Sequence, residues 1–278
     1  MVLVHFQGGL GNQIFQYAFY LGLKSQGYMV KADLSSFHKK YEKRDFELIS
    51  VFGIELEDAS EEEVDKMIGT GSGIINRVRN HFLRKKNYVP EEQFDMSILL
   101  RKKNVFLDGY WQNIAFFSNV EADLRKKLSF QCKSDRAGII SRIKDCESVA
   151  LHIRLGDYLE YQEIYGGVCT MEYYQKGICY LKEQLNNPVF FVFSDEIAKT
   201  KEILKREEDC FIYVEKEKHD YQDMYLMSLC KHNIIANSSF SWWAAWLNSN
   251  PEKIVIMPAG WTRMTDSEKL CCEDWIRI

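Results

Sequence analysis

An arginine at the end of a buried strand is the first group in this sequence that could do chemistry. In the segment SVALHIRLGDY (148–158), apolar and polar positions alternate, so His152 and Arg154 share one face of a strand. A buried guanidinium needs an anionic partner, and its planar fork suits a diphosphate or a carboxylate. Arg154 could therefore bind a ligand phosphate or pair with a structural acid. His152 could equally be a core histidine with its hydrogen bonds satisfied.

Hydroxyl groups follow a second buried strand, in the segment IIANSSFSWWAAWLN (234–248). Ser238 and Ser239 stand where a helix should begin, and the free backbone N–H groups of a helix start attract anions. The helical spacing of the three tryptophans that follow favours core packing over a stacking platform. The segment therefore predicts an anion site at the end of this strand.

A carboxylate ends a third strand, in the segment FFVFSDE (190–196). Asp195 either caps the helix that follows or accepts two parallel hydrogen bonds from the N1–H and amino edge of guanine. The first reading is structural, and the second makes Asp195 a reader of a nucleotide base.

A glycine-rich turn follows the first strand, in the segment FQGGLGNQIF (6–15). Gly9 lets the backbone approach a phosphate or a sugar, and the next helix points its N-terminus at the same place. The dinucleotide-binding fingerprint lacks its third glycine here, although Asp33 lies where a ribose-binding acid would stand. An NAD-dependent oxidoreductase is therefore one alternative, and a tight turn with Asn12 as the helix cap is another.

These four polar segments need a parallel sheet to bring them together, because ligands bind at the carboxyl ends of parallel strands. In the second half of the chain the pattern predicts strands at 148–154, 189–193, 211–214, 233–236 and 253–257, and helices at 170–185, 196–206, 220–230 and 239–248. In the first half it predicts strands at 2–6, 28–32 and 105–108, and helices at 12–26 and 60–69. This alternation indicates an α/β fold with two domains, 1–140 and 141–278.

Composition excludes several classes of protein. The 278 residues carry a formal net charge of −4, which argues against a nucleic-acid partner. No apolar run reaches the ~18 residues of a membrane-spanning helix, and the first residues do not form a secretory signal. The eight cysteines lack metal-binding spacing, so we expect no metal and free thiols in a reducing cytoplasm.

One stretch departs from the acidic average. Residues 74–104 contain eight Lys or Arg against three acids, a net charge of +5. The stretch is either a solvated basic face or a patch for an anionic acceptor or a membrane surface. We therefore keep open a peripheral contact with the inner membrane.

The same segments carry a family resemblance. FQGGLGNQIFQYA, HIRLGDY, VFFVFSDE and DMYLMSLCKHNIIANSSFSWWAAWLN resemble, in this order, the bacterial α-1,2-fucosyltransferases of glycosyltransferase family 11. The resemblance is strong at the N-terminus and in the second half, and thin from about 35 to 130. It implies a GT-B-type architecture, with two Rossmann-like domains whose parallel sheets face a cleft. It also implies an inverting transfer of L-fucose from GDP-β-L-fucose to a galactose-terminated glycan, without a metal or other cofactor.

The resemblance also implies roles for single residues. Arg154 matches the arginine that contacts the β-phosphate of the donor, and His152 would lie beside the nucleoside. Asp195 matches a reader of guanine.

Two further segments match donor-binding positions of the family. The serine-rich helix start would hold the diphosphate through Ser238, Ser239 and Phe240. The glycine-rich turn would lie near the sugar and the pyrophosphate from the opposite domain, through Gly9 and Asn12.

One position departs from the family pattern HxRRGDY, because Leu155 stands where a second arginine is common. This departure leaves open a catalytically inactive module that binds a nucleotide or a glycan. The reaction also needs a base for the acceptor hydroxyl. Asp157 is the first candidate, by its position after the phosphate-binding strand, and the others are Glu160, Glu163 and His5.

Overall fold

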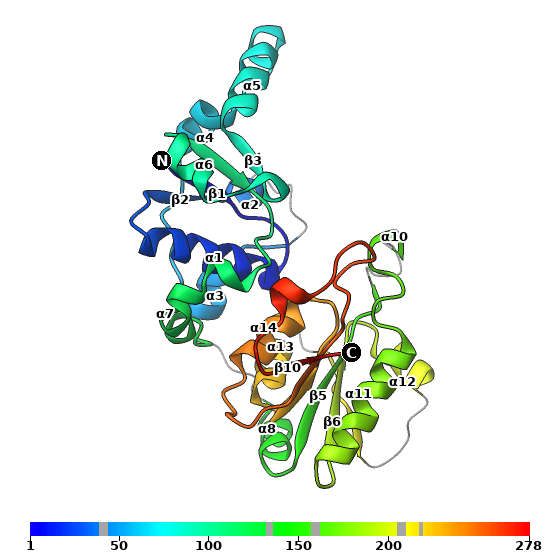
Figure 1. The fold of residues 1–278 in the computed structure, drawn as a ribbon. Helices are drawn as coiled ribbons and strands as arrows, with labels where there is room; N and C mark the ends of the chain where they lie inside the picture. The colour runs from blue at the N-terminus through cyan, green and yellow to red at the C-terminus, as the bar shows by residue number, and fades with distance from the viewer. Residues whose placement is uncertain (39–43, 132–135, 157–161, 205–209, 217–218) are drawn as a thin grey trace. The chain divides into compact units, whose positions relative to one another are not determined.

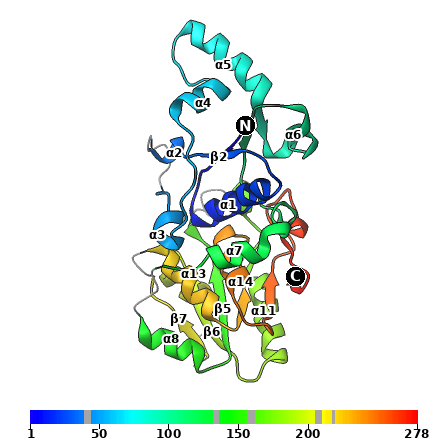
Figure 2. The same cartoon turned by 90° about the vertical axis from the view of Figure 1, so that its left-hand side faces the viewer.

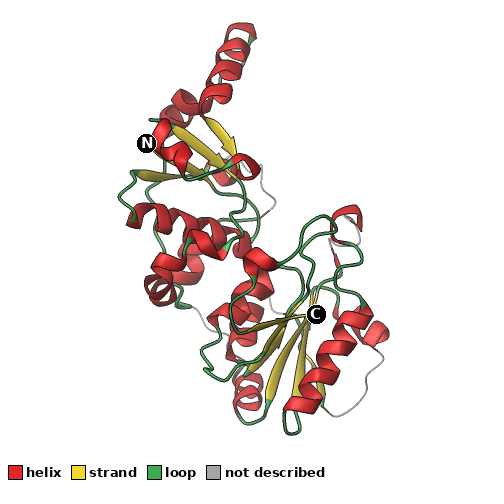
Figure 3. Ribbon diagram, in the orientation of Figure 1, coloured by secondary structure: helices red, strands yellow, loops and turns green. Residues whose placement is uncertain are grey.

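Two parallel sheets organise the chain in the computed structural model, one in the unit Met1–Gln131 and one in the unit Cys132–Ile278 (Figure 1). The structure describes residues 1–38, 44–131, 136–156, 162–204, 210–216 and 219–278. The α/β fold class and the parallel sheets predicted from the sequence are confirmed (Figure 3).

The sheet of the first unit has four parallel strands in the order β2-β1-β4-β3. Its strands are β1 (Val2–His5), β2 (Val30–Asp33), β3 (Tyr88–Pro90) and β4 (Val105–Asp108). Because β1 pairs with both β2 and β4, the carboxyl ends of these three strands lie side by side. The short strand β3 was not predicted.

Helices follow the strands of the first unit. They are α1 (Leu10–Ser25), α2 (Ser35–His38), α3 (Leu48–Phe52), α4 (Glu61–Ile68), α5 (Ile74–Asn87), α6 (Ser97–Arg101) and α7 (Glu121–Lys127). The predicted capping box at α4 is confirmed, since Ser60 and Glu63 each bond the other's backbone N–H. Helix α1 has Gly9 as its N-cap, so Asn12 lies in the first turn and is not the cap.

Two buried glutamines of α1 hold the loops that leave β1 and β4. The Gln16 Oε1 accepts from the Gln7 N–H at 3.1 Å, and its Nε2 donates to the Gly109 carbonyl at 3.1 Å. The Gln13 Nε2 donates to the Gly8 carbonyl at 2.9 Å. These bonds fix the glycine-rich turn against the end of β4.

The sheet of the second unit has six parallel strands in the order β10-β9-β8-β5-β6-β7. They are β5 (Ser148–Ile153), β6 (Val189–Ser194), β7 (Phe211–Tyr213), β8 (His232–Ile234), β9 (Val255–Met257) and β10 (Trp275–Arg277). Along the chain, the strands first add on one side of β5 and then, from β8, on the other. This is the strand order of a doubly wound fold, whose ligands bind where the direction reverses, between β5 and β8.

Helices cover both faces of this sheet (Figure 2). They are α8 (Ala137–Lys144), α10 (Gln162–Tyr165), α11 (Met171–Gln184), α12 (Ile197–Leu204), α13 (Asp220–Leu229) and α14 (Ser239–Leu247). Leu151 and Ile153 of β5 pack in a buried cluster with Ile178 and Leu181 of α11. By the alternation of the strand, His152 points to the opposite face, toward α14.

The structure divides the chain within the stretch 130–147 in which the sequence places the domain boundary, but earlier than residue 140. A division after residue 140 would pass through α8, whose Ala137–Lys144 lies in the second unit. The structure divides the chain after Gln131. Strand β10 and helix α8 also escaped prediction, whereas the five strands predicted for the second half are present within one or two residues.

Candidate functional site

The carboxyl ends of β5 and β8 bring together the residues that the sequence singled out in the second unit. Arg154 follows β5 directly, and Ser238 precedes α14 after β8. The register pairs Leu151 with Ile234, so the two strands end next to each other. The guanidinium and the start of α14 therefore stand at the switch point of the sheet, where a doubly wound fold binds its ligand.

Arg154 is held by Asp195, from the end of neighbouring β6. The Arg154 Nε lies 3.2 Å from the Asp195 Oδ2, and the two side chains are 19% and 15% exposed. The Asp195 carboxylate also accepts the backbone N–H groups of Leu155 at 3.0 Å and Gly156 at 3.1 Å. These bonds fix the guanidinium and the backbone of Leu155 and Gly156 in one arrangement.

These contacts bear on the two readings of Asp195. Both carboxylate oxygens, which the sequence assigned to guanine, already accept hydrogen bonds in the structure. The geometry favours the alternative in which Arg154 pairs with a structural acid, and the contact with guanine stays a prediction. Gly156 makes this packing possible, because a Cβ there would lie 2.6 Å from the Asp195 Oδ2.

The aromatic rings of His152 and Phe240 lie near one another on the α14 side of the sheet. Their centroids are 6.1 Å apart, and the histidine is 4% exposed. Phe240 is partly exposed. The prediction that these two residues contribute to one site is therefore consistent with their placement.

The start of α14 places backbone N–H groups at the end of β8. Ser238 is the N-cap with extended backbone, and among the described residues its side chain makes no capping hydrogen bond. The first N–H groups of a helix lack partners within the helix and attract anions. The Asn237 side chain donates to the Trp261 carbonyl at 2.9 Å, which fixes this turn against the loop after β9.

A cavity of about 900 Å³ opens beside Arg154. Its lining comes from the ends of β5, β9 and β10 and from the segment before α11, and it includes Leu155, Tyr165, Cys169, Gly260, Thr262 and Arg263. Burial raises the pKa of the Cys169 thiol to about 12, so this thiol is neutral. Among the described residues that line the cavity, Arg154 and Arg263 carry positive charge.

Arg263 is a residue that the sequence analysis missed. It lies in the loop between β9 and β10, and its backbone N–H donates to the Ile164 carbonyl at 2.8 Å. This bond joins α10 to the loop between β9 and β10, which both contribute residues to the lining of the cavity. Arg263 lines the same cavity as Leu155, although the two residues are far apart in the sequence. Arg263 lies in a loop and belongs to no alternating or helical pattern, so the sequence offered no sign that it would line the cavity.

Comparison with known proteins identifies the family. A model of glycosyl transferase family 11 matches residues 73–278, which is more than half of the chain. The chain belongs to glycosyl transferase family 11. It is therefore a glycosyltransferase, as the resemblance of its motifs predicted.

Relatives within the family match the chain over its length. The chain is 34% identical to an α-1,2-colitosyltransferase of Escherichia coli, covering 100% of this chain and 99% of that protein. It is 31% identical to the O-antigen biosynthesis glycosyltransferase WbnK of Escherichia coli, covering 98% of each. It is 24% identical to the galactoside α-(1,2)-fucosyltransferase 1 of Plecturocebus brunneus, covering 86% of this chain and 63% of that protein.

Among solved structures, a mutant of Arabidopsis thaliana FUT1 in complex with GDP is similar to this chain. The TM-score is 0.49 and the identity 14%, and the match covers 94% of this chain and 71% of that chain.

The first unit of this family 11 enzyme carries a second polar cluster, at the carboxyl ends of β1 and β4. The His5 Nδ1 lies 2.8 Å from the Asp108 Oδ1, and its Nε2 lies 2.7 Å from the Ser36 Oγ. The Tyr88 hydroxyl donates to the Asp108 Oδ2 at 2.5 Å, and the Gln7 amide donates to Oδ1 at 3.0 Å. We call His5, Asp108 and Ser36 the first-unit triad.

Charges within this cluster fix its protonation. Burial alone would raise the pKa of Asp108, but the hydrogen bonds from His5 and Tyr88 outweigh burial and lower it. Burial and the bond to Asp108 raise the pKa of Tyr88 to about 12. An ionised Asp108 can only accept, so the His5 Nδ1 carries a proton toward it. In the neutral form of the ring the Nε2 then accepts from the Ser36 hydroxyl.

The glycine-rich turn lies in the same unit as the triad. Gly8 has a φ of +78°, and the Asn12 Oδ1 accepts from the Gln112 side chain at 3.0 Å. The Arg44 side chain lies against Gly9, where an added Cβ would be 3.2 Å from its Cδ. The predicted contacts of Gly9 and Asn12 with the donor stay predictions.

The four predicted candidates for the acceptor base have different outcomes. Asp157 and Glu160 lie outside the described residues, and Glu163 is exposed on α10. His5 belongs to the first-unit triad.

Metal and membrane predictions were also compared with the structure. In the described part of the chain, no three His, Cys, Asp or Glu side chains gather where they could hold a metal ion. Across the described helices, none has the length and hydrophobicity that crossing a bilayer requires. The absence of a cofactor and the cytoplasmic location stay predictions.

Proposed function

We propose that this glycosyltransferase moves L-fucose from GDP-β-L-fucose to the 2-hydroxyl of a terminal galactoside, with inversion, in glycan or O-antigen synthesis. The observation that carries the proposal is the placement of Arg154 beside the start of α14 at the switch point of the second sheet. The names of two relatives support the linkage, because both describe α-1,2 transfer.

Departure of the diphosphate is the difficult part of such a transfer. The bond between the sugar C1 and the phosphate oxygen breaks, and its electron pair leaves with GDP. The Arg154 guanidinium and the first N–H groups of α14 meet this growing negative charge. Asp195 holds Arg154 in place before the ligand arrives, so little reorganisation is needed during the reaction. Because these groups supply positive charge, we expect activity to survive treatment with EDTA.

The cavity lined by Arg154 and Arg263 suits a diphosphate. Two guanidinium groups can share a charge that one arginine would otherwise meet alone. Arg263 thus offers a substitute for the second arginine that the family commonly has at the position of Leu155. The enzyme can therefore be active even though Leu155 stands where the family commonly has a second arginine.

The acceptor hydroxyl must lose a proton as its oxygen bonds to C1. We propose that His5 Nε2 takes this proton, and that Asp108 stabilises the resulting imidazolium through Nδ1. In the ligand-free protein, the Ser36 hydroxyl occupies the place at Nε2 that the acceptor hydroxyl would take. Asp157 stays the alternative base, and a single-turnover assay of Asp157→Asn distinguishes them, since an active variant removes Asp157.

A second donor deserves a direct comparison. The relative with 34% identity over the whole chain is named a colitosyltransferase, which favours colitose as a second candidate sugar. Colitose differs from fucose in lacking the 3-hydroxyl, so the two GDP-sugars share the features that Arg154 and α14 recognise. The sugar subsite alone must choose between them.

The test is an assay with both donors against a panel of galactose-terminated acceptors, followed by NMR analysis of the product linkage. Efficient transfer of fucose to O2 of galactose is the expected result. Faster transfer from GDP-colitose would replace fucose by colitose, and transfer to another hydroxyl would overturn the linkage. An enzyme that neither transfers nor hydrolyses either donor would be the inactive binding module.

Ligand binding separates this function from the oxidoreductase alternative. GDP is expected to raise the melting temperature of the protein, because a ligand that binds the folded state stabilises it. NAD is expected to leave the melting temperature unchanged. The reverse result would favour the nicotinamide reaction.

A further inference from the structure

Helix α5 turns its apolar side chains to solvent. It projects from the first unit beyond α4 (Figures 1 and 2). Ile74, Ile75, Val78 and Phe82 are 82%, 86%, 70% and 65% exposed. Their spacing puts them on one side of the helix, which we call the apolar face of α5. A helix of a water-soluble domain normally buries such a face.

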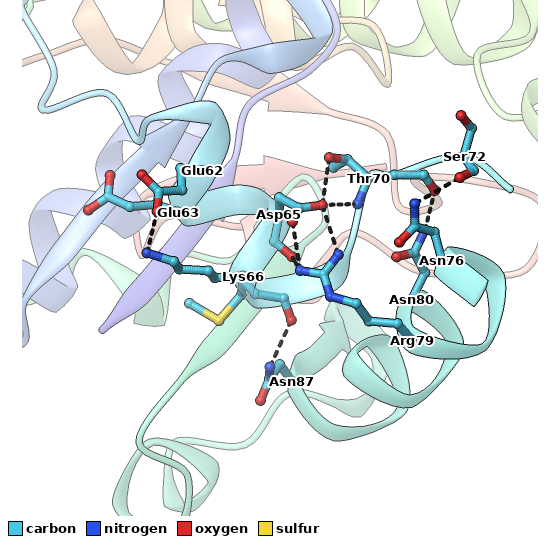
Figure 4. A network of polar contacts seen from close by, with 12 residues as sticks. Glu62, Glu63, Asp65, Lys66, Thr70, Ser72, Asn76, Arg79, Asn80 and Asn87 are labelled. Atoms are coloured by element: carbon cyan, nitrogen blue, oxygen red, sulfur yellow. Dashed lines mark hydrogen bonds and ion pairs between the residues drawn. The ribbon is translucent and has the colours of Figure 1, made fainter.

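The opposite side of α5 is polar and anchored (Figure 4). The Arg79 Nη2 lies 2.6 Å from the Asp65 Oδ2 of α4, and the Asn80 amide donates to the Gly71 carbonyl at 2.8 Å. At the end of the helix, the buried Asn87 amide donates to the Met67 carbonyl at 2.7 Å. The hydrogen bond from Arg79 holds the pKa of Asp65 well below its usual range.

These bonds fix the rotation of α5 about its axis. Arg79 and Asn80 are adjacent and Asn87 lies two turns further on, so turning the apolar face inward would break the bonds of all three residues at once. The helix therefore presents the apolar face of α5 to whatever lies outside the unit.

Positive charge surrounds the apolar face. Helix α5 contains no acid, and four of its cationic residues are exposed: Arg77, Arg84, Lys85 and Lys86. Basic residues continue at the end of α6, where the Lys102 ammonium donates to the Lys86 carbonyl at 2.7 Å. Leu100, beside them, is 81% exposed. The surface is thus apolar at its centre and cationic at its margins.

This combination selects one kind of occupant. A second copy of the same helix would bring cations against cations, which disfavours self-association. An anionic bilayer offers hydrocarbon for the apolar side chains and phosphate for the Lys and Arg side chains. Only the bilayer satisfies both halves of the surface.

We propose that α5 docks this enzyme on the surface of an anionic membrane, with the apolar face of α5 inserted among the lipid headgroups and its Lys and Arg side chains on the phosphates. The proposal goes beyond the proposed function and does not depend on which sugar is transferred. It assigns a role to the basic stretch at 74–104 that the donor site leaves unused.

The test is flotation of the full chain with vesicles of phosphatidylcholine and phosphatidylglycerol, and with phosphatidylcholine alone. We expect strong binding to the anionic vesicles, weakened by salt, and weak binding to the neutral ones. Lys85→Gln with Lys86→Gln should lower the partition coefficient about 30-fold, at roughly fivefold for each charge. Ile75→Asp with Phe82→Asp should lower it at least as much.

The control is Met29→Asp, which changes a side chain 71% exposed in the same unit but away from α5. It should bind like the unchanged protein. All variants should keep their melting temperature and their activity on a soluble acceptor, because the altered residues are exposed. No binding of the unchanged protein to anionic vesicles would overturn the proposal, as would unchanged binding of the aspartate variant. A dimer in sedimentation that Phe82→Asp dissociates would replace the membrane by a second copy.

Discussion

At the carboxyl edge of the second unit's sheet, Arg154 and the start of α14 present positive charge, whereas the same edge of the first unit's sheet presents Asp108 and the His5 Nε2. Both edges belong to parallel sheets of similar construction. In the proposed reaction, the edge in the second unit would meet the charge of a leaving diphosphate, and the edge in the first unit would accept a proton. The fold therefore supplies the place for chemistry, and the side chains at the strand ends decide which half of a transfer reaction each place can serve.

The largest effect is expected at the cationic edge. Arg154→Ala should lower turnover by roughly 10²–10³-fold or more, because it removes the charge that stabilises the departing diphosphate. Hydrolysis of the donor without acceptor should fall equally, since it breaks the same bond. Steady-state rates of transfer and of hydrolysis provide the measurement. Near-normal turnover would assign Arg154 to structure alone.

The proton-accepting edge should respond differently. His5→Gln should lower transfer by about 10²-fold, which is typical of losing a general base. Donor hydrolysis should change much less, because water can use another path for its proton. The measurement is the ratio of transfer to hydrolysis.

The matched control for this prediction is His38→Gln. It alters an exposed histidine at the end of α2 whose ring lies near the Asp58 carboxylate. It should keep both rates. Equal loss of transfer and hydrolysis in His5→Gln would show that the first-unit triad is not a base, without affecting the assignment of the donor site.

A smaller effect is expected from the second arginine of the cavity. Arg263→Ala should weaken GDP binding about tenfold, because a hydrogen bond to a charged group contributes ~1.5 kcal/mol. Guanosine, which lacks phosphate, should bind almost as before. Calorimetry with both ligands measures the difference. Arg277→Ala, an exposed arginine on β10, is the control, and an equal response in both variants would exclude a specific role for Arg263.

The smallest effect is a change of stability with pH at the first-unit edge. The folded state lowers the pKa of Asp108, so this carboxylate stabilises the fold fully above its unfolded pKa of about 4. The contribution is lost as the pH falls through the lower folded value. Asp108→Asn should therefore flatten the decline of melting temperature below about pH 4. An unchanged decline would mean that Asp108 is not preferentially ionised in the folded state.

Prediction from sequence succeeded where one strand carried a regular pattern. The alternation in 148–154 was sufficient to predict β5, and the serine cluster was sufficient to place the start of α14. The sequence did not decide whether Arg154 pairs with Asp195, because the two residues follow different strands, and the distance between those strands depends on the strand order in the sheet.

The features that escaped prediction are of two kinds. Some are formed by contacts between residues far apart in the sequence, and in helix α5 the polar side faces inward and the apolar side faces outward. Arg263 reaches the cavity through the bond of its loop to Ile164. Helix α5 was read only as a basic stretch, because its inward stripe is polar and the usual rule expects apolar residues there. The first-unit triad joins residues from β1, α2 and β4, and sequence alone suggested only His5.

The position of β5 has a consequence for motion. This strand is buried along its whole length and pairs with β6 on one side and β8 on the other. Its amide protons should be among the last of the second unit to exchange with solvent, because they open only when the sheet itself opens. The guanidinium that follows β5 is attached to this strand, so we expect it to have little positional freedom, which suits the proposed role in a reaction that tolerates little displacement.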